Sequence, residues 1–120
     1  MGDGRTDDGH MVGLRGYVAQ DCTQIGVDHY YFHSEERAKE ELHRLVKGAT
    51  KVVQQGAPKT SWDQFFVGER AVVMFAGDES SADGYFVLRT SGDELLRVGS
   101  SSLEVLLEFE RWFFSDPPAK

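Results

Sequence analysis

The stretch from residue 65 to residue 98, FFVGERAVVMFAGDESSADGYFVLRTSGDELLRV, contains three apolar runs separated by two polar turns. The run from Ala71 to Ala76 has no polar residue, which is typical of a strand buried on both faces. Glycine, aspartate and serine are common in the two separators, residues 77–84 and 91–93, as they are in hairpin turns. The stretch therefore predicts three consecutive antiparallel strands, with the first central in the sheet: 65–76, 85–90 and 95–98.

Two further strands are predicted ahead of this stretch. Residues 12–20, VGLRGYVAQ, include tyrosine and valine and are followed by a polar cluster, as expected for a strand that ends in a turn. Residues 27–33, VDHYYFH, form the second strand, on which alternation places His29 and His33 on the same face. We expect these two strands to form a hairpin.

Two helices are predicted from capping residues and from apolar spacing. Ser34 offers an N-cap to a helix over 35–55, in which Gly48 is a weak point. Ser101 and Glu104 match a capping box at the start of a second helix. This helix carries apolar residues at helical spacing, and two prolines end it: Leu103, Leu106, Leu107, Phe113 and Phe114, then Pro117 and Pro118.

The predicted order is ββαβββα, an α+β fold with a mostly antiparallel five-stranded sheet and two helices packed on one face. Residues 1–10 contain no apolar residue after Met1, so we expect a disordered tail followed by a single α+β domain over 11–120. The tail also lacks the basic and apolar regions of a signal peptide, which favours a cytoplasmic location.

Composition excludes several classes of function. The 120 residues include 20 acidic and 13 basic side chains, and a net charge of −7 argues against a nucleic-acid partner. No apolar stretch approaches the roughly 18 residues of a membrane span, so no membrane partner is expected. No phosphate-binding glycine motif is present, and we predict no cofactor.

The residues best suited to chemistry are Cys22, His29 and His33. His29 and His33 would lie about 13 Å apart on a straight strand, which is too far for both to bind one metal ion, so no metal site is predicted. A cysteine and a histidine across the hairpin, with Asp28 as an orienting group, would suit a thiolate mechanism. The alternative hypothesis is therefore a small enzyme or ligand-binding domain that uses Cys22, His29 and His33. No residue is assigned a catalytic role.

Charge and aromatic residues favour a protein-binding module instead. Residues 77–120 contain nine acids and four bases, for a charge of −5, whereas residues 11–76 contain eight of each. Apolar residues also cover most of the second helix, which indicates contact with a partner or a homodimer through this helix. The alternative without a partner is a solvated acidic surface that only aids solubility. The candidate partner-binding residues are Asp78, Glu79, Asp83, Glu104, Glu108, Phe109 and Trp112.

The stretch from Ala71 to Phe109 also resembles a known family. Its segments VVMFAGDESSADGYFVL, GDELLRV and SSSLEVLLEF follow the pattern of an apolar strand, a Gly/Asp-rich hairpin, another strand and a Ser-led amphipathic helix. This pattern resembles the C-terminal half of the SUKH superfamily of bacterial immunity proteins. The resemblance implies a non-enzymatic acidic protein that neutralises a toxin by binding it, and it transfers no functional residue. The leading hypothesis is thus an immunity or inhibitor-type protein that binds a basic partner protein.

Overall fold

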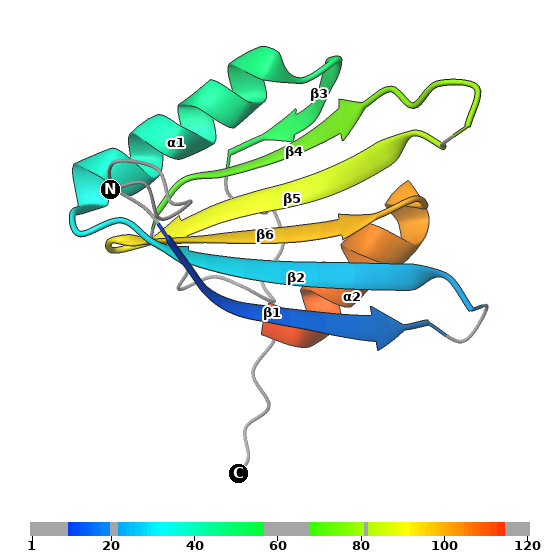
Figure 1. Cartoon of the computed structure of the whole chain (residues 1–120), viewed down its shortest axis with the longest axis horizontal. Coiled ribbons are helices and arrows are strands. Elements are labelled where there is room, and N and C mark those ends of the chain that lie inside the picture. The colour runs from blue at the N-terminus through cyan, green and yellow to red at the C-terminus, as the bar shows by residue number, and fades with distance from the viewer. Residues whose placement is uncertain (1–9, 20–21, 57–67, 81, 115–120) are drawn as a thin grey trace, which may run out of the picture.

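The computed structural model describes residues 10–19, 22–56, 68–80 and 82–114, which form six strands and two helices (Figure 1). In chain order, these elements are β1 His10–Val18, β2 Gln24–Tyr31, α1 Glu35–Gly48, β3 Lys51–Gln55, β4 Arg70–Phe75, β5 Gly84–Ser91, β6 Glu94–Ser100 and α2 Leu103–Phe114. The α+β class is confirmed, but the order is ββαββββα because the sheet contains one strand more than predicted.

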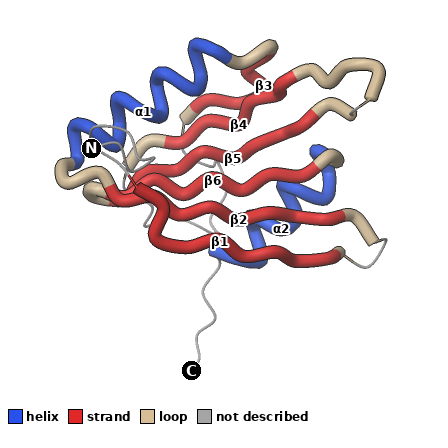
Figure 2. The backbone as a smooth tube through the Cα atoms, in the orientation of Figure 1, coloured by secondary structure: helices blue, strands red, loops and turns tan. Residues whose placement is uncertain are grey.

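The six strands form one antiparallel sheet in the order β1-β2-β6-β5-β4-β3 (Figure 2). The predicted hairpin of β1 and β2 and the meander of β4, β5 and β6 are both confirmed. Ala71, Val72 and Val73 are fully buried, as the apolar run predicts. However, β4 is not central, because β3 pairs along its outer side and β5 and β6 occupy the middle of the sheet.

The strand that sequence analysis missed is β3, which lies within the range predicted as the end of the first helix. Helix α1 ends at Gly48, and Thr50 donates its backbone N–H to the Met74 carbonyl at 2.9 Å. Residues 51–55, KVVQQ, then pair antiparallel with β4. Val52 and Val53 continue the helical spacing by chance, but β-branched residues after a helix-weakening glycine favour the strand.

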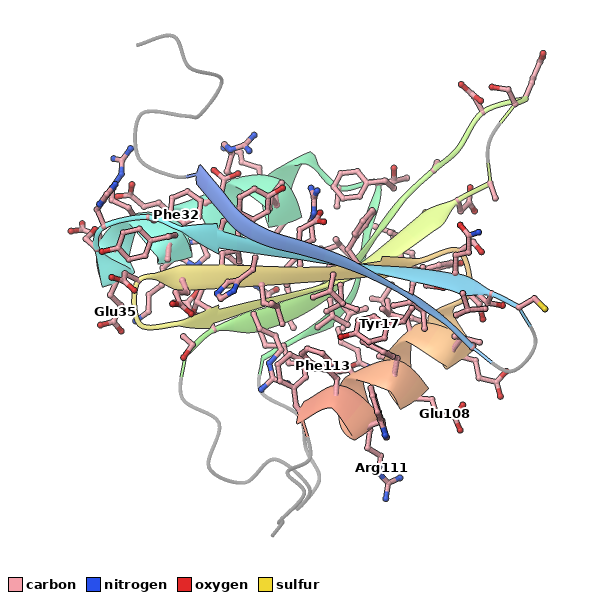
Figure 3. The ribbon with its side chains drawn as sticks, turned by 60° about the horizontal axis from the view of Figure 1, so that its bottom comes forward. Tyr17, Phe32, Glu35, Glu108, Arg111 and Phe113 are labelled. Carbon is pink, nitrogen blue, oxygen red and sulfur yellow. The ribbon has the colours of Figure 1, made fainter. Side chains whose placement is uncertain are left out.

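The two helices cover opposite faces of the sheet, so the predicted packing on one face is wrong (Figure 3). Val72 belongs to the apolar cluster that includes residues of α2, whereas Ala71 and Val73 belong to the cluster that includes residues of α1. Successive side chains on a strand point to opposite faces, so a continuous apolar run needs cover on both. Each helix supplies the cover on one face.

The helix starts agree in part with the predicted capping. Ser34 is the N-cap of α1, and its hydroxyl accepts the Arg37 N–H at 3.1 Å, as predicted. At α2 the capping hydroxyl belongs to Ser102, which accepts the Val105 N–H at 3.3 Å, so the assignment to Ser101 is off by one residue. His10, placed in the predicted tail, begins β1. The predictions for residues 1–9, for 65–67 and for the prolines after α2 lie outside the described residues.

Candidate functional site

An apolar groove lies between α2 and the β1–β2 hairpin. It encloses about 340 Å³. Helix α2 packs mainly on β5 and β6, so the strands at this edge of the sheet have less helical cover. The groove is lined by Tyr17, Val18, Ala19, Ile25, Val105, Glu108, Phe109 and Trp112. This lining combines three of the predicted partner-binding residues with residues of β1 and β2 that sequence analysis did not select.

Trp112 is the most prominent side chain of the groove. It is 66% exposed, yet its ring lies 5.5 Å from the Phe109 ring and 6.4 Å from the Tyr17 ring, measured between centroids. Distances of about 4.5–7 Å are those of favourable aromatic pairs. Trp112 is therefore held on one side by two aromatic neighbours and presented to solvent on the other. Val18, on the opposite wall, is 68% exposed.

Phe109 is a core residue more than a surface residue. It is only 8% exposed and belongs to the cluster that also contains Leu106 and Val98. Phe109 was predicted as a partner-binding residue, but it follows Leu106 by three residues and so lies beside it on the buried stripe of α2. Only part of its surface contributes to the groove.

Among the described residues that line the groove, Glu108 is the one with a charged side chain. At about 100° per residue, Glu108 lies about 40° from Trp112 around the helix, and exposed Glu104 follows further round. Arg111, also exposed, lies about 100° from Trp112 around the helix. Figure 3 shows Arg111 and Glu108 on the side of α2 that faces away from the sheet. Around the helix, the two carboxylates therefore lie nearer to Trp112 than Arg111 does.

The acidic residues of the β4–β5 hairpin lie on a different surface. Asp78 accepts the backbone N–H of Ser80 at 2.8 Å, and Asp83 accepts that of Gly77 at 2.9 Å. These two carboxylates thus shape their own loop, and the loop extends away from α2 in Figure 3. Asp78, Glu79 and Asp83 are not brought together with Glu104, Glu108 and Trp112.

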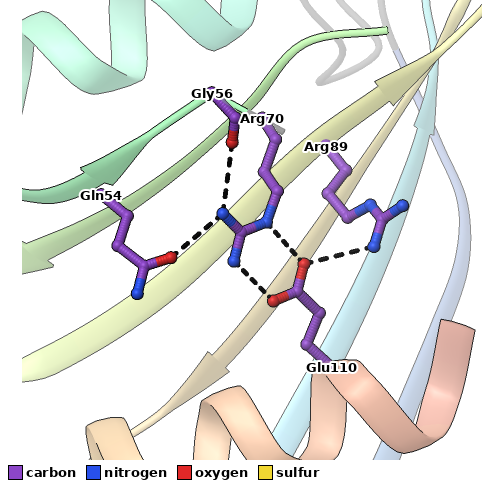
Figure 4. A network of polar contacts seen from close by, with 5 residues as sticks. All are labelled: Gln54, Gly56, Arg70, Arg89 and Glu110. Carbon is purple, nitrogen blue, oxygen red and sulfur yellow. Dashed lines mark hydrogen bonds and ion pairs between the residues drawn. The ribbon is translucent and has the colours of Figure 1, made fainter. Parts of the chain in front are cut away.

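A buried ion network on the α2 face was missed by sequence analysis (Figure 4). Glu110, 1% exposed, accepts hydrogen bonds at 2.7 Å from both Nε and Nη2 of Arg70, and one at 3.2 Å from Nη1 of Arg89. Arg70 also donates to Gln54 and to the carbonyl oxygen of Gly56. The network ties α2 to β4 and β5. Because Glu110 is buried, its charge does not add to the acidic surface that was predicted from the charge of residues 77–120.

The network does leave a signal in the sequence. Glu110 follows Leu106 by four residues, which places it on the buried stripe of the helix. Arg70 and Arg89 lie two residues from Val72 and Val87, and so on the same buried face of their strands. A carboxylate and two guanidinium groups at core positions must be paired, because an unpaired buried charge is very costly.

Cys22, His29 and His33 do not form a joint site. Cys22 is exposed and precedes β2, which begins at Gln24. At about 3.3 Å per residue, Gln24 is about 16 Å from His29 along the strand, so Cys22 and His29 lie far apart. His29 pairs with Glu94 at 2.8 Å. The strand ends at Tyr31, so His33 does not continue its face as predicted. In the described ranges, no group of three or more His, Cys, Asp or Glu side chains could hold a metal ion.

A second polar cluster lies on the α1 face of the sheet. Arg97 donates to Asp28 through Nε at 3.0 Å and to the Tyr30 hydroxyl at 3.2 Å. Burial raises the pKa of the Tyr30 phenol above its usual 10.0, and the Arg97 guanidinium partly opposes this shift. Asp28 thus pairs with an arginine and does not orient a histidine.

Comparison with protein-family models gives no match, and comparison with curated proteins gives none either. Neither of the helices in the described ranges is long and apolar enough to cross a membrane. The function is therefore inferred from the structure of the chain itself, in which the groove beside Trp112 is the candidate site.

Proposed function

We propose that this chain is a small acidic protein-interaction module of the immunity or inhibitor type, which binds and neutralises a basic partner protein. The observation that carries this proposal is Trp112, two-thirds exposed yet held by Tyr17 and Phe109 at the wall of an apolar groove. Large aromatic side chains of this kind are enriched among the residues that dominate binding energy.

The surroundings of Trp112 support a partner of defined chemistry. The groove suits an apolar side chain, and Glu108 and Glu104 beside it suit lysine or arginine at the edge of the contact. Because the aromatic neighbours already restrict Trp112, binding would lose little side-chain entropy there. The resemblance of residues 71–109 to the SUKH superfamily adds support for a bacterial toxin as the partner.

A homodimer through α2 would use the same surface. Two copies would bring together surfaces of the same sign, since each chain carries a net charge of −7 and has acidic residues beside the groove. A basic protein is therefore the better occupant. The alternative reading as an enzyme gains no support from the geometry, which separates Cys22 from His29 by much of β2.

The test is co-expression with the product of the gene adjacent to that of this chain, followed by calorimetric titration of the purified pair. We expect Trp112→Ala to weaken binding by about 2 kcal/mol, or roughly thirtyfold. Val52→Ala is the matched control, because Val52 is an exposed apolar residue on the opposite edge of the sheet.

The charge contribution needs its own pair of variants. We expect Glu108→Gln to weaken binding several-fold and to reduce the dependence of affinity on salt. Glu36→Gln, on the exposed first turn of α1, should change neither. The proposed function is wrong for this surface if Trp112→Ala binds the partner as tightly as the unaltered protein does.

A further inference from the structure

The two edges of the sheet differ in how open they are to another strand. On the β3 edge, the strand is only five residues long, begins with Lys51 and has an irregular register between Val52 and Gln54. Short length, lysine and bulges are the features that protect an edge from further pairing. On the other edge, β1 is nine residues long, its register irregularity lies near its start, between Met11 and Gly13, and no strand in the described part of the chain pairs with its outer side.

The hydrogen bonds of the β1–β2 hairpin show which backbone groups of β1 face outward. Ala19 donates its N–H to the Thr23 carbonyl at 2.9 Å, so this residue faces β2. Bonding alternates along an antiparallel strand, and the register is regular from Gly13 to Val18. The N–H groups of Gly16 and Val18 therefore point to the outer edge.

The outward-facing amides lie on the strand that forms one wall of the groove. Tyr17, Val18 and Ala19 all line the groove, opposite Val105 and Trp112 of α2. A strand added beside β1 would place alternate side chains on the α2 face of the sheet, next to this opening. The edge can thus supply backbone hydrogen bonds, and the groove can accept a side chain.

We infer, on the basis of the proposed function, that a basic partner binds by adding an extended segment as a strand to the outer edge of β1. One apolar side chain of that segment enters the groove beside Trp112, and a neighbouring lysine or arginine lies against Glu108. Main-chain hydrogen bonds then provide affinity, and the groove and its acidic edge provide selectivity.

Charge favours a foreign segment over a second copy of this chain at the same edge. Pairing of β1 with β1 of a second copy would bring together two chains that each carry a charge of −7. It would also add the Glu108 of a second groove to the same contact. A segment with alternating basic and apolar residues has the complementary charge and the two-residue period of a strand.

The probe for this inference is a synthetic peptide of alternating lysine and valine, as long as β1. Its binding is followed by amide hydrogen exchange and by NMR of the full chain. At saturation, exchange at Gly16 and Val18 should slow by about tenfold or more, while Tyr17, which already faces β2, should change little. A peptide with glutamate in place of lysine should not bind.

Two substitutions at one position separate backbone from side-chain effects. Val18→Pro removes an outward N–H, and proline is tolerated at edge positions where that group does not pair within the sheet. It should weaken peptide binding by about tenfold, as expected for loss of one backbone hydrogen bond. Val18→Ala keeps the N–H and should bind more tightly than Val18→Pro. If Val18→Pro fails to fold, the exchange rates of Gly16 and Val18 in the unaltered protein, with and without peptide, decide whether a strand is added to β1.

The outcomes distinguish this inference from the proposed function. If Trp112→Ala weakens binding but the exchange at Gly16 and Val18 is unchanged, strand addition is overturned while partner binding at the groove stands. If Trp112→Ala has no effect on the peptide or on the natural partner, the proposed function fails with it. If the edge amides are protected without peptide and light scattering shows a dimer, a second copy occupies the edge and the inference is overturned.

Discussion

Replacement of Glu110 by glutamine is expected to lower the free energy of unfolding by about 3–5 kcal/mol. The Glu110 carboxylate is buried and accepts three charge-assisted hydrogen bonds, two from Arg70 and one from Arg89. Glutamine keeps the size of the side chain but removes its charge. Arg70 and Arg89 are direct partners in the β4–β5 register, so two buried guanidinium groups would then lie side by side without this counter-ion.

The assay is urea unfolding followed by circular dichroism at neutral pH. The matched control is Glu40→Gln, which removes the partner of Arg37 in an ion pair whose two side chains are both about half exposed on α1. Exposed pairs of this kind contribute about 1 kcal/mol or less. A loss for Glu110→Gln no larger than that of the control would refute the conclusion that the network is shielded from water.

A triple variant tests whether the unpaired charges cause the loss. Arg70→Met, Arg89→Met and Glu110→Leu together remove the three charges of the network in the described part of the chain and keep its approximate volume. Apolar replacement of a complete buried ion network is often neutral or stabilising, so we expect the triple variant to be more stable than Glu110→Gln alone. If it is equally unstable, the loss arises from altered packing of α2 instead.

Three further predictions concern single residues. Phe109→Ala should cost about 3–5 kcal/mol of stability, because its side chain is in the core, whereas Trp112→Ala should cost far less in the same urea titration. Gly99→Ala should destabilise by about 1–3 kcal/mol, since the new Cβ would lie 2.5 Å from the Phe86 ring. Because the Tyr30 pKa is raised in the folded state, stability should fall as pH rises past 10.0, and Tyr30→Phe should reduce that fall.

The elements with strong local signals were predicted well. The apolar run of β4 and its two following turns identified the meander, because hairpin turns and strand alternation depend on nearby residues. Ser34 likewise marked the start of α1, since an N-cap acts within one turn of the helix. Helix spacing failed at β3, where pairing with β4 determines the structure and the local sequence fits either element.

The arrangement of the helices required information from distant parts of the chain. The apolar run of β4 already implied two buried faces, but which helix covers each face depends on packing across the whole sheet. For the site, the apolar cover of the second helix predicts Trp112 and the charge of residues 77–120 predicts Glu108, and the structure places both in the groove lining. The other wall of the groove was missed, because Tyr17 and Val18 approach α2 only through the fold.

The buried network also bears on how the groove works. Glu110 precedes Trp112 by two residues on α2, so the contacts of Glu110 with β4 and β5 help to fix the helix that presents the aromatic ring. Substitution of Arg70 would therefore weaken partner binding without removing any side chain from the groove. If only the affinity of each variant were measured, Arg70 would be assigned incorrectly to the binding surface. Unfolding measured on the same variants separates the two roles, because Trp112→Ala lowers affinity at nearly constant stability, whereas loss of Arg70 lowers stability together with affinity.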